Sequence, residues 1–176
     1  SQFKPKNIIL YEQSEFNLYK VERDLLEYSE LSKLKIKSIL GDVCDPIKFE
    51  FICKKYSVDT IFHAAAYKHV PLIENNIIEA FKNNILGTRN CLEIAIKSNI
   101  KRFVLISTDK AVRPTNFMGA TKRVTEMMVQ ALDYKFKNAK TKFTIVRFGN
   151  VLGSSGSVLP LFKKQISERK PLTVTH

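Results

Sequence analysis

The chain has 176 residues, 44% of them hydrophobic, and carries a net charge of +12 at pH 7. This length and composition fit one globular domain or a large part of one. No apolar run in the sequence approaches the ~20 residues that span a membrane. Cys44, Cys53 and Cys91 form no CxxC pair, so we expect neither a disulfide framework nor a metal site, and we expect a cytoplasmic location.

The positive charge fits several kinds of partner. Lysines and arginines attract nucleic acid, anionic lipid or a phosphorylated small molecule, but scattered lysines also simply keep a surface soluble. Because the sequence shows no basic stripe interleaved with aromatic residues, we expect no nucleic-acid partner.

Short apolar runs alternate with longer amphipathic stretches along the chain. The apolar runs are predicted strands at 7–11, 36–40, 60–64, 102–107 and 142–147. The other stretches are predicted helices at 14–28, 46–56, 77–98, 116–136 and 158–167. This alternation is typical of βαβ units and predicts an α/β fold around a parallel sheet.

Small and polar residues follow the predicted strands. They are Glu12, Asp42, Ala64, Ala65, Ala66, the run from Ser107 to Lys110, Gly149 and Asn150. The carboxyl ends of parallel strands meet at one edge of a sheet, where α/β proteins bind ligands. The sequence therefore predicts a ligand crevice along that edge.

Three of these positions have a specific meaning for a dinucleotide. An acid at Glu12 can accept both ribose hydroxyls of an adenosine and would repel a 2′-phosphate, which favours NAD over NADP; the alternative is a solvated loop acid. Asp42 either contacts the adenine or caps the next helix. The alanines at 64–66 either admit a flat ligand close to the backbone or pack a helix against the sheet.

Four segments resemble a known family. HAAAYKHVPLIE (63–74), NNILGT (83–88), STDKAVRPTNFMGATKR (107–123) and RFGNVLGSSGSVLPLFKKQI (147–166) are similar to extended short-chain dehydrogenase/reductases of bacterial polysaccharide biosynthesis. The resemblance is greatest to the 4,6-dehydratases of UDP-N-acetylglucosamine, in the branch whose full-length members are membrane-anchored. It implies a Rossmann-like doubly wound sheet, NAD as cofactor, a homo-oligomer, and a place at the cytoplasmic face of the inner membrane.

The family begins with a strand and a Gly-rich turn that holds the cofactor pyrophosphate, and no such glycine run precedes Asn7. The family also continues into a substrate lobe beyond His176. We therefore expect residues 1–176 to be an internal part of an NAD-binding domain. In the doubly wound strand order, the first strand lies between those at 7–11 and 60–64, so these two are not expected to pair with each other.

The reaction implied by the resemblance is oxidation at C4 of the sugar, loss of water across C5 and C6, and reduction at C6. Most relatives begin it with a Tyr four residues before a Lys, but Met118 occupies that place before Lys122, and a thioether carries no proton. We therefore assign proton transfer to Thr108, Asp109 and Lys110. Lys110 removes the C5 proton, and Asp109 protonates the leaving hydroxyl. Asp109 can also receive the C4 proton through Thr108 or a water.

Each catalytic assignment has a structural alternative. Asp109 is otherwise a residue that leads into a helix, and Lys110 its solvated neighbour. Met118 is otherwise a core residue of its helix, like Met127 and Met128. Lys122 is expected to donate a hydrogen bond beneath the nicotinamide ribose.

The resemblance also assigns the remaining contacts by position. The cofactor contacts are Glu12, Ser14, Asp42, Val43, Ala64, Ala65, Ala66, Asn84 and Lys122, with Asn84 also bracing the catalytic loop. The substrate contacts are Lys68, His69, Asn150, Ser154, Ser157 and Val158, although a lone histidine such as His69 is more often structural. Two other functions stay open on the same scaffold: a UDP-sugar C4 epimerase, and a non-catalytic NAD-binding relative.

Overall fold

The computed structural model describes residues 5–27, 34–137, 139–151 and 158–173. Its strands are β1 (Asn7–Glu12), β2 (Lys35–Leu40), β3 (Thr60–His63), β4 (Arg102–Thr108) and β5 (Lys142–Phe148). Its α-helices are α1 (Glu15–Glu27), α2 (Pro46–Lys55), α3 (Val70–Glu74), α4 (Ile77–Ala80), α5 (Gly87–Lys97), α6 (Phe117–Lys135) and α7 (Val158–Ser167). Strands and helices alternate as predicted, which confirms the α/β fold.

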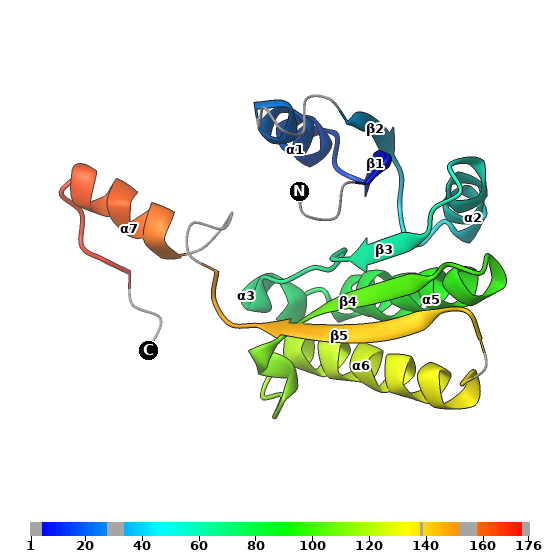
Figure 1. Cartoon of the computed structure of the whole chain (residues 1–176). Coiled ribbons are helices and arrows are strands. Elements are labelled where there is room, and N and C mark those ends of the chain that lie inside the picture. Colours follow the sequence, from blue (N-terminus) through cyan, green and yellow to red (C-terminus); the bar gives the residue numbers. More distant parts are fainter. Residues whose placement is uncertain (1–4, 28–33, 138, 152–157, 174–176) are drawn as a thin grey trace.

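The described strands form two parallel sheets, in the orders β1-β2 and β3-β4-β5 (Figure 1). Asn7 of β1 is in register with Lys35 of β2, and Thr60 of β3 with Arg102 of β4. Among the described strands β1 pairs only with β2, and β3 only with β4. The prediction that the strands at 7–11 and 60–64 do not pair with each other is therefore confirmed.

Three helices build the main core against the larger sheet. Cys91 and Leu92 of α5 are fully buried together with Phe103 and Leu105 of β4, and Val129 of α6 belongs to the same cluster. Helix α2 contributes to it from the neighbouring position, in contact with α5. Helix α1 instead packs on β1 and β2, and α7 lies apart from both sheets at the left of Figure 1.

Helix starts follow from local hydrogen bonds. Asp45 caps α2, since its Oδ1 accepts the backbone N–H of Lys48 at 3.0 Å and Pro46 follows directly. Asn116 caps α6 in the same way, accepting the N–H of Gly119 at 2.8 Å. None of the helices in the described residues is long and apolar enough to cross a bilayer.

The predicted helix at 77–98 is interrupted by a different geometry. Between α4 and α5 the chain forms a π-helix, η1 (Phe81–Leu86), in which the N–H of Gly87 bonds to the carbonyl of Lys82. This turn buries both Asn83 and Asn84. Such π-turns occur mostly inside α-helices and often at functional sites.

Candidate active site

The carboxyl ends of β4 and β5 bring the predicted catalytic residues together. Strand β4 ends at Thr108 and continues into a single 3₁₀ turn, η2 (Asp109–Ala111). The Nζ of Lys110 lies 3.3 Å from Oδ1 of Asp109 and 3.3 Å from Oδ1 of Asn150, just beyond β5. The structure thus joins an acid, an amine and an amide at one point of the sheet edge.

Thr108 organises this turn. Its Oγ1 donates to Oδ1 of Asp109 at 2.8 Å and accepts the backbone N–H of Lys110 at 3.3 Å. The hydrogen bond from Thr108, followed by the contacts of Lys110, lowers the pKa of Asp109. Asp109 is therefore a carboxylate at neutral pH, and it must first take up a proton before it can give one to a leaving group.

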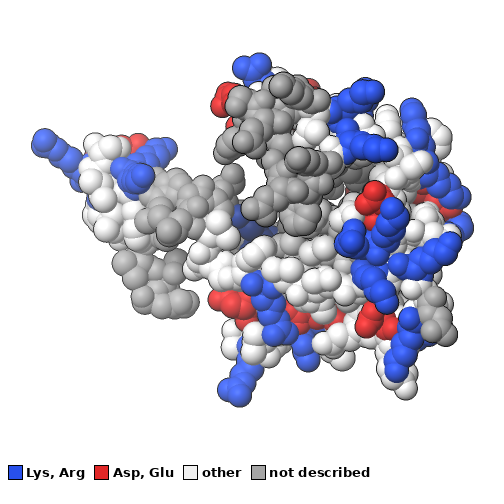
Figure 2. Space-filling view, viewed as in Figure 1, with Lys and Arg blue, Asp and Glu red and all other residues white. Residues whose placement is uncertain are grey.

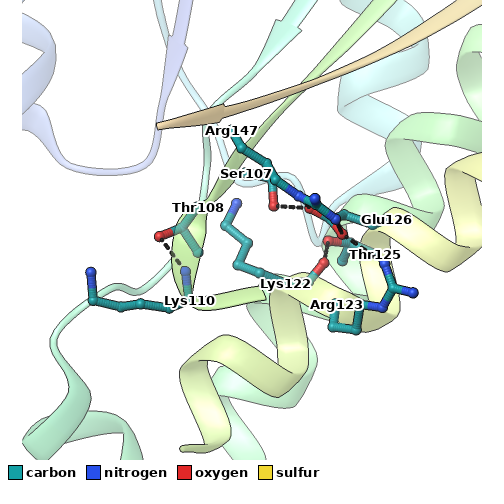
Figure 3. A network of polar contacts seen from close by, with 8 residues as sticks. All are labelled: Ser107, Thr108, Lys110, Lys122, Arg123, Thr125, Glu126 and Arg147. Atoms are coloured by element: carbon teal, nitrogen blue, oxygen red, sulfur yellow. Dashed lines mark hydrogen bonds and ion pairs between the residues drawn. The ribbon is translucent and has the colours of Figure 1, made fainter. Parts of the chain in front are cut away.

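Lys122 occupies a different position, on α6 beneath β4 (Figure 3). Its Nζ donates to the main-chain oxygen of Ile106 at 2.8 Å. Burial lowers the pKa of Lys122 to about 8, although the nearby charge of Glu126 acts in the opposite direction. The side chain therefore loses its proton closer to neutral pH than an ordinary lysine does.

Met118 is a core residue. It is 5% exposed and clusters with Ile73 and Ala80, at the start of α6. This burial supports the alternative of a packing role for Met118, which agrees with the lack of any proton on a thioether.

The acidic residues on the smaller sheet are held by backbone contacts. Oε1 of Glu12 accepts the N–H of Ser14 at 2.9 Å, and Oγ of Ser14 accepts the N–H of Asn17 at 3.3 Å at the start of α1. Oδ1 of Asp42 accepts the N–H of Cys44 at 2.7 Å. Because Asp45 caps α2, the interpretation of Asp42 as that helix cap was wrong.

Asn84 supports the site from below. It is 1% exposed, and its Oδ1 accepts the N–H of Tyr67 at 2.8 Å and an amide hydrogen of Asn83 at 3.0 Å. Its Nδ2 donates to the oxygen of Tyr67 and to Oγ1 of Thr121, both at 3.1 Å. Its side-chain donors and acceptors are used inside the protein, and they brace the segment after β3 against α6.

The remaining predicted residues are spread more widely. Ala64 is exposed, Ala65 packs against the main core, and Val43 is buried in that core. Lys68 and His69 are exposed in the segment before α3. Ser154 and Ser157 lie outside the described residues, and Val158 begins α7 without a described side chain.

His63 is a buried residue of the site that the sequence reasoning missed. Its Nε2 lies 2.8 Å from Oγ1 of Thr88, whose hydroxyl donates to the oxygen of Asn84 at 2.6 Å. Since that hydroxyl proton is already used, Nε2 of His63 is the donor. Burial, and then the charge of Lys122, lower the pKa of His63 to about 3, so the ring is neutral.

Glu126 is the second residue that was missed. It is completely buried on α6. Arg147 of β5 donates two hydrogen bonds to its carboxylate, from Nε at 2.9 Å and from Nη2 at 2.7 Å (Figure 3). The available signal was its spacing, because an acid four residues after Lys122 lies on the same inward face of the helix.

The chain matches the family model described as "Polysaccharide biosynthesis protein" over residues 1–176. It is 50% identical to the probable polysaccharide biosynthesis protein EpsC of Bacillus subtilis over its whole length, which is 29% of that protein. It is 37% identical to a UDP-N-acetylglucosamine 4,6-dehydratase (inverting) of Campylobacter jejuni, covering 98% of this chain and 50% of that one. A UDP-glucose 4-epimerase of Rickettsia canadensis is 41% identical over 82% of this chain and 42% of its own.

A solved structure shows the same fold. Pen from Bacillus thuringiensis superposes with a TM-score of 0.88 at 38% identity, over 99% of this chain and 52% of that one. This likeness confirms the Rossmann-like α/β architecture. The chain spans half or less of the length of the curated relatives described above. By its complete match to the family model, the chain belongs to the polysaccharide biosynthesis protein family.

Proposed function

We propose that the protein containing this chain is an NAD-dependent 4,6-dehydratase of UDP-N-acetylglucosamine. The observation that carries the proposal is the contact of Lys110 with both Asp109 and Asn150 at the carboxyl edge of the sheet. It supplies an acid and a base beside each other where Met118 offers no proton. The dehydratase relative from C. jejuni supports the choice of reaction and sugar.

The residues present fit NAD. The carboxylate of Glu12 ends β1 and is oriented by Ser14, the chemistry that ribose hydroxyls require. When bound, NAD supplies a reversible oxidation at C4, which makes the C5 proton acidic. Lys122 would hold a hydroxyl-bearing ligand through its remaining N–H groups, since one N–H already donates to the oxygen of Ile106.

The chain's own groups account for every proton. The carboxylate of Asp109 takes the proton of the C4 hydroxyl, directly or through Thr108, and later gives it to the C6 hydroxyl as the C6–O bond breaks and water leaves. Lys110, as the free amine, takes the C5 proton and returns it to C5 at the end.

We place this reaction in the cytoplasm, where Cys44, Cys53 and Cys91 remain free thiols as the structure has them. Positively charged side chains spread over the surface in Figure 2 fit a diphosphate substrate but do not locate it. A homo-oligomeric assembly stays a prediction.

A second candidate is a UDP-sugar C4 epimerase, since an epimerase relative also matches. The test is incubation of the full-length protein with UDP-N-acetylglucosamine and NAD, followed by mass spectrometry. Loss of one water from the sugar supports the dehydratase. An epimer of unchanged mass supports the epimerase, and unchanged substrate with measurable NAD binding supports a non-catalytic relative.

A further inference from the structure

Glu126 is a buried charge that the proposed reaction does not use. Its side chain is 0% exposed, yet it is surrounded by hydrogen-bond donors from three elements. Besides the two bonds from Arg147, Oε1 accepts Oγ–H of Ser107 at 2.6 Å, and Oε2 accepts Nη1–H of Arg123 at 3.2 Å. A carboxylate with this many partners stays ionised, and the pKa of Glu126 is lowered to about 2, first by Arg147.

The partners of Glu126 lie within three residues of the site in the sequence. Ser107 directly precedes Thr108, and Nζ of Lys122 donates to the oxygen of Ile106, the residue before Ser107. Helix α6 therefore bonds β4 at two consecutive residues. Arg147 lies three residues before Asn150 at the end of β5. The carboxylate therefore connects α6, which carries Lys122, with β4 and β5 (Figure 3). Lys110 follows β4 and Asn150 follows β5, and these two residues contact each other.

We propose that Glu126 is a positioning residue, which fixes the ends of β4 and β5 and the start of α6 so that Lys110, Asn150 and Lys122 face one bound sugar. This inference rests on the proposed function and deepens it. The role does not follow from stability alone, because a buried ion pair is often no more stabilising than apolar residues of the same volume. The hydrogen bonds to Glu126 have preferred directions, so they can fix the relative positions of α6, β4 and β5, which apolar contacts cannot do.

Glu126 also acts on Lys122 through its charge. The ionisable groups that face Glu126 are Lys122 and Arg123 on α6 and Arg147 on β5, while Ser107 of β4 is uncharged. His63 of β3 faces Lys122, and burial keeps its ring neutral. The negative charge of Glu126 raises the pKa of Lys122 against the effect of burial. Its removal therefore lets Lys122 lose its proton at lower pH.

The experiment uses the full-length protein with Glu126→Gln, which keeps the shape but places an amide group against Arg147. Ser107→Ala is the milder second variant, since it removes one donor and leaves the ion pair. The matched control is Glu93→Gln on α5, whose carboxylate is exposed and lies 3.6 Å from Arg89.

We expect Glu126→Gln to lower kcat on the order of 10²-fold, the scale of a misplaced reacting group, with KM changed less than about threefold. The high-pH limb of the rate profile should move to lower pH, which a merely stabilising residue would not cause. Ser107→Ala should lower kcat by about tenfold, and Glu93→Gln should have no effect. Unchanged kcat and pH profile in both site variants would overturn the proposal.

Hydrogen exchange separates this inference from the proposed function. If the wild-type protein does not transform UDP-N-acetylglucosamine, the dehydratase proposal fails, but the backbone amides of residues 108–110 and 149–150 still report on positioning. They should exchange faster in Glu126→Gln and in Ser107→Ala, and not in Glu93→Gln. If Glu126→Gln does not fold, Ser107→Ala decides alone, and unchanged exchange in it contradicts the inference.

Discussion

Gly119 of α6 lies directly against the main chain of Lys110. A Cβ at Gly119 would be only 2.5 Å from the carbonyl oxygen of Lys110. The carbonyl oxygen is part of the backbone and cannot rotate away from an added Cβ. The first turn of α6 therefore packs closely against the turn that carries Asp109 and Lys110. Placement of the amine therefore depends on the absence of one methyl group.

Gly119→Ala tests this contact. In open space, alanine in a helix would stabilise the protein by about 1 kcal/mol relative to glycine. Here we expect destabilisation of about 1–3 kcal/mol, because the clash is with backbone, and a loss of turnover as Lys110 shifts. Urea titrations measure the free energy of unfolding of this variant. In the same titrations, Ala131→Gly at an exposed position of α6 measures the difference in helix propensity between the two residues. A stabilised, fully active Gly119→Ala protein would disprove the contact.

Asp109→Asn and Lys110→Ala should each lower turnover on the order of 10²-fold or more, because each removes a proton carrier. The double variant should lose little beyond the single ones, since both residues serve one elimination. Lys110→Ala should also reduce deuterium incorporation at C5 from heavy water. Normal incorporation in that variant would exclude Lys110 as the C5 base.

Met118→Leu should retain most of the turnover, since the apolar cluster with Ile73 and Ala80 requires shape and no proton. Met118→Tyr should not restore a tyrosine mechanism. The larger ring overpacks the cluster, and we expect a loss of about 1–3 kcal/mol in thermal unfolding experiments. A stable Met118→Tyr protein with increased turnover would show that this position faces the substrate.

The sequence predicted most of the fold because its signals there are periodic. Apolar runs predicted β1 to β5 nearly to the residue, and the polar residues after the strands predicted that Lys110 and Asn150 lie at one edge of the sheet, but not that they touch. Helix α3 was missed because five residues carry too little periodicity. Glu126 was missed because a charge in a helix is normally solvated, and only its buried partners, Arg147 and Ser107, show otherwise.

Asn84→Ala should destabilise the protein by roughly 3 kcal/mol, since it removes the side-chain partner of the N–H and the oxygen of Tyr67 and the amide that donates to the hydroxyl of Thr121. Asn75→Ala is the matched control, because that amide makes one exposed bond to the oxygen of Pro71 at 3.0 Å. The melting temperatures of the two variants check this. Equal melting temperatures would mean that the bracing role is wrong.

Glu12→Ala should weaken NAD binding and relax discrimination against NADP, because the carboxylate that accepts ribose hydroxyls and repels a 2′-phosphate is removed. Titration of the full-length protein with both cofactors measures the ratio of dissociation constants. Glu15→Ala, in the first turn of α1, is the neighbouring control. Wild-type protein that prefers NADP would contradict the assignment.

The π-turn at Phe81–Leu86 makes the effect of a deletion depend on where it falls. A π-turn holds one residue more than an α-turn, so deletion of a single residue there would return the helix to regular winding. Because both kinds of turn sweep nearly the same angle about the axis, Thr88, Cys91 and Leu92 would still face the core. A deletion inside α5 would instead rotate every later residue of that helix by about 100°. We expect the helix to tolerate the loss of one residue within the π-turn, at the cost of the contacts of Asn84 with Tyr67, and not within α5.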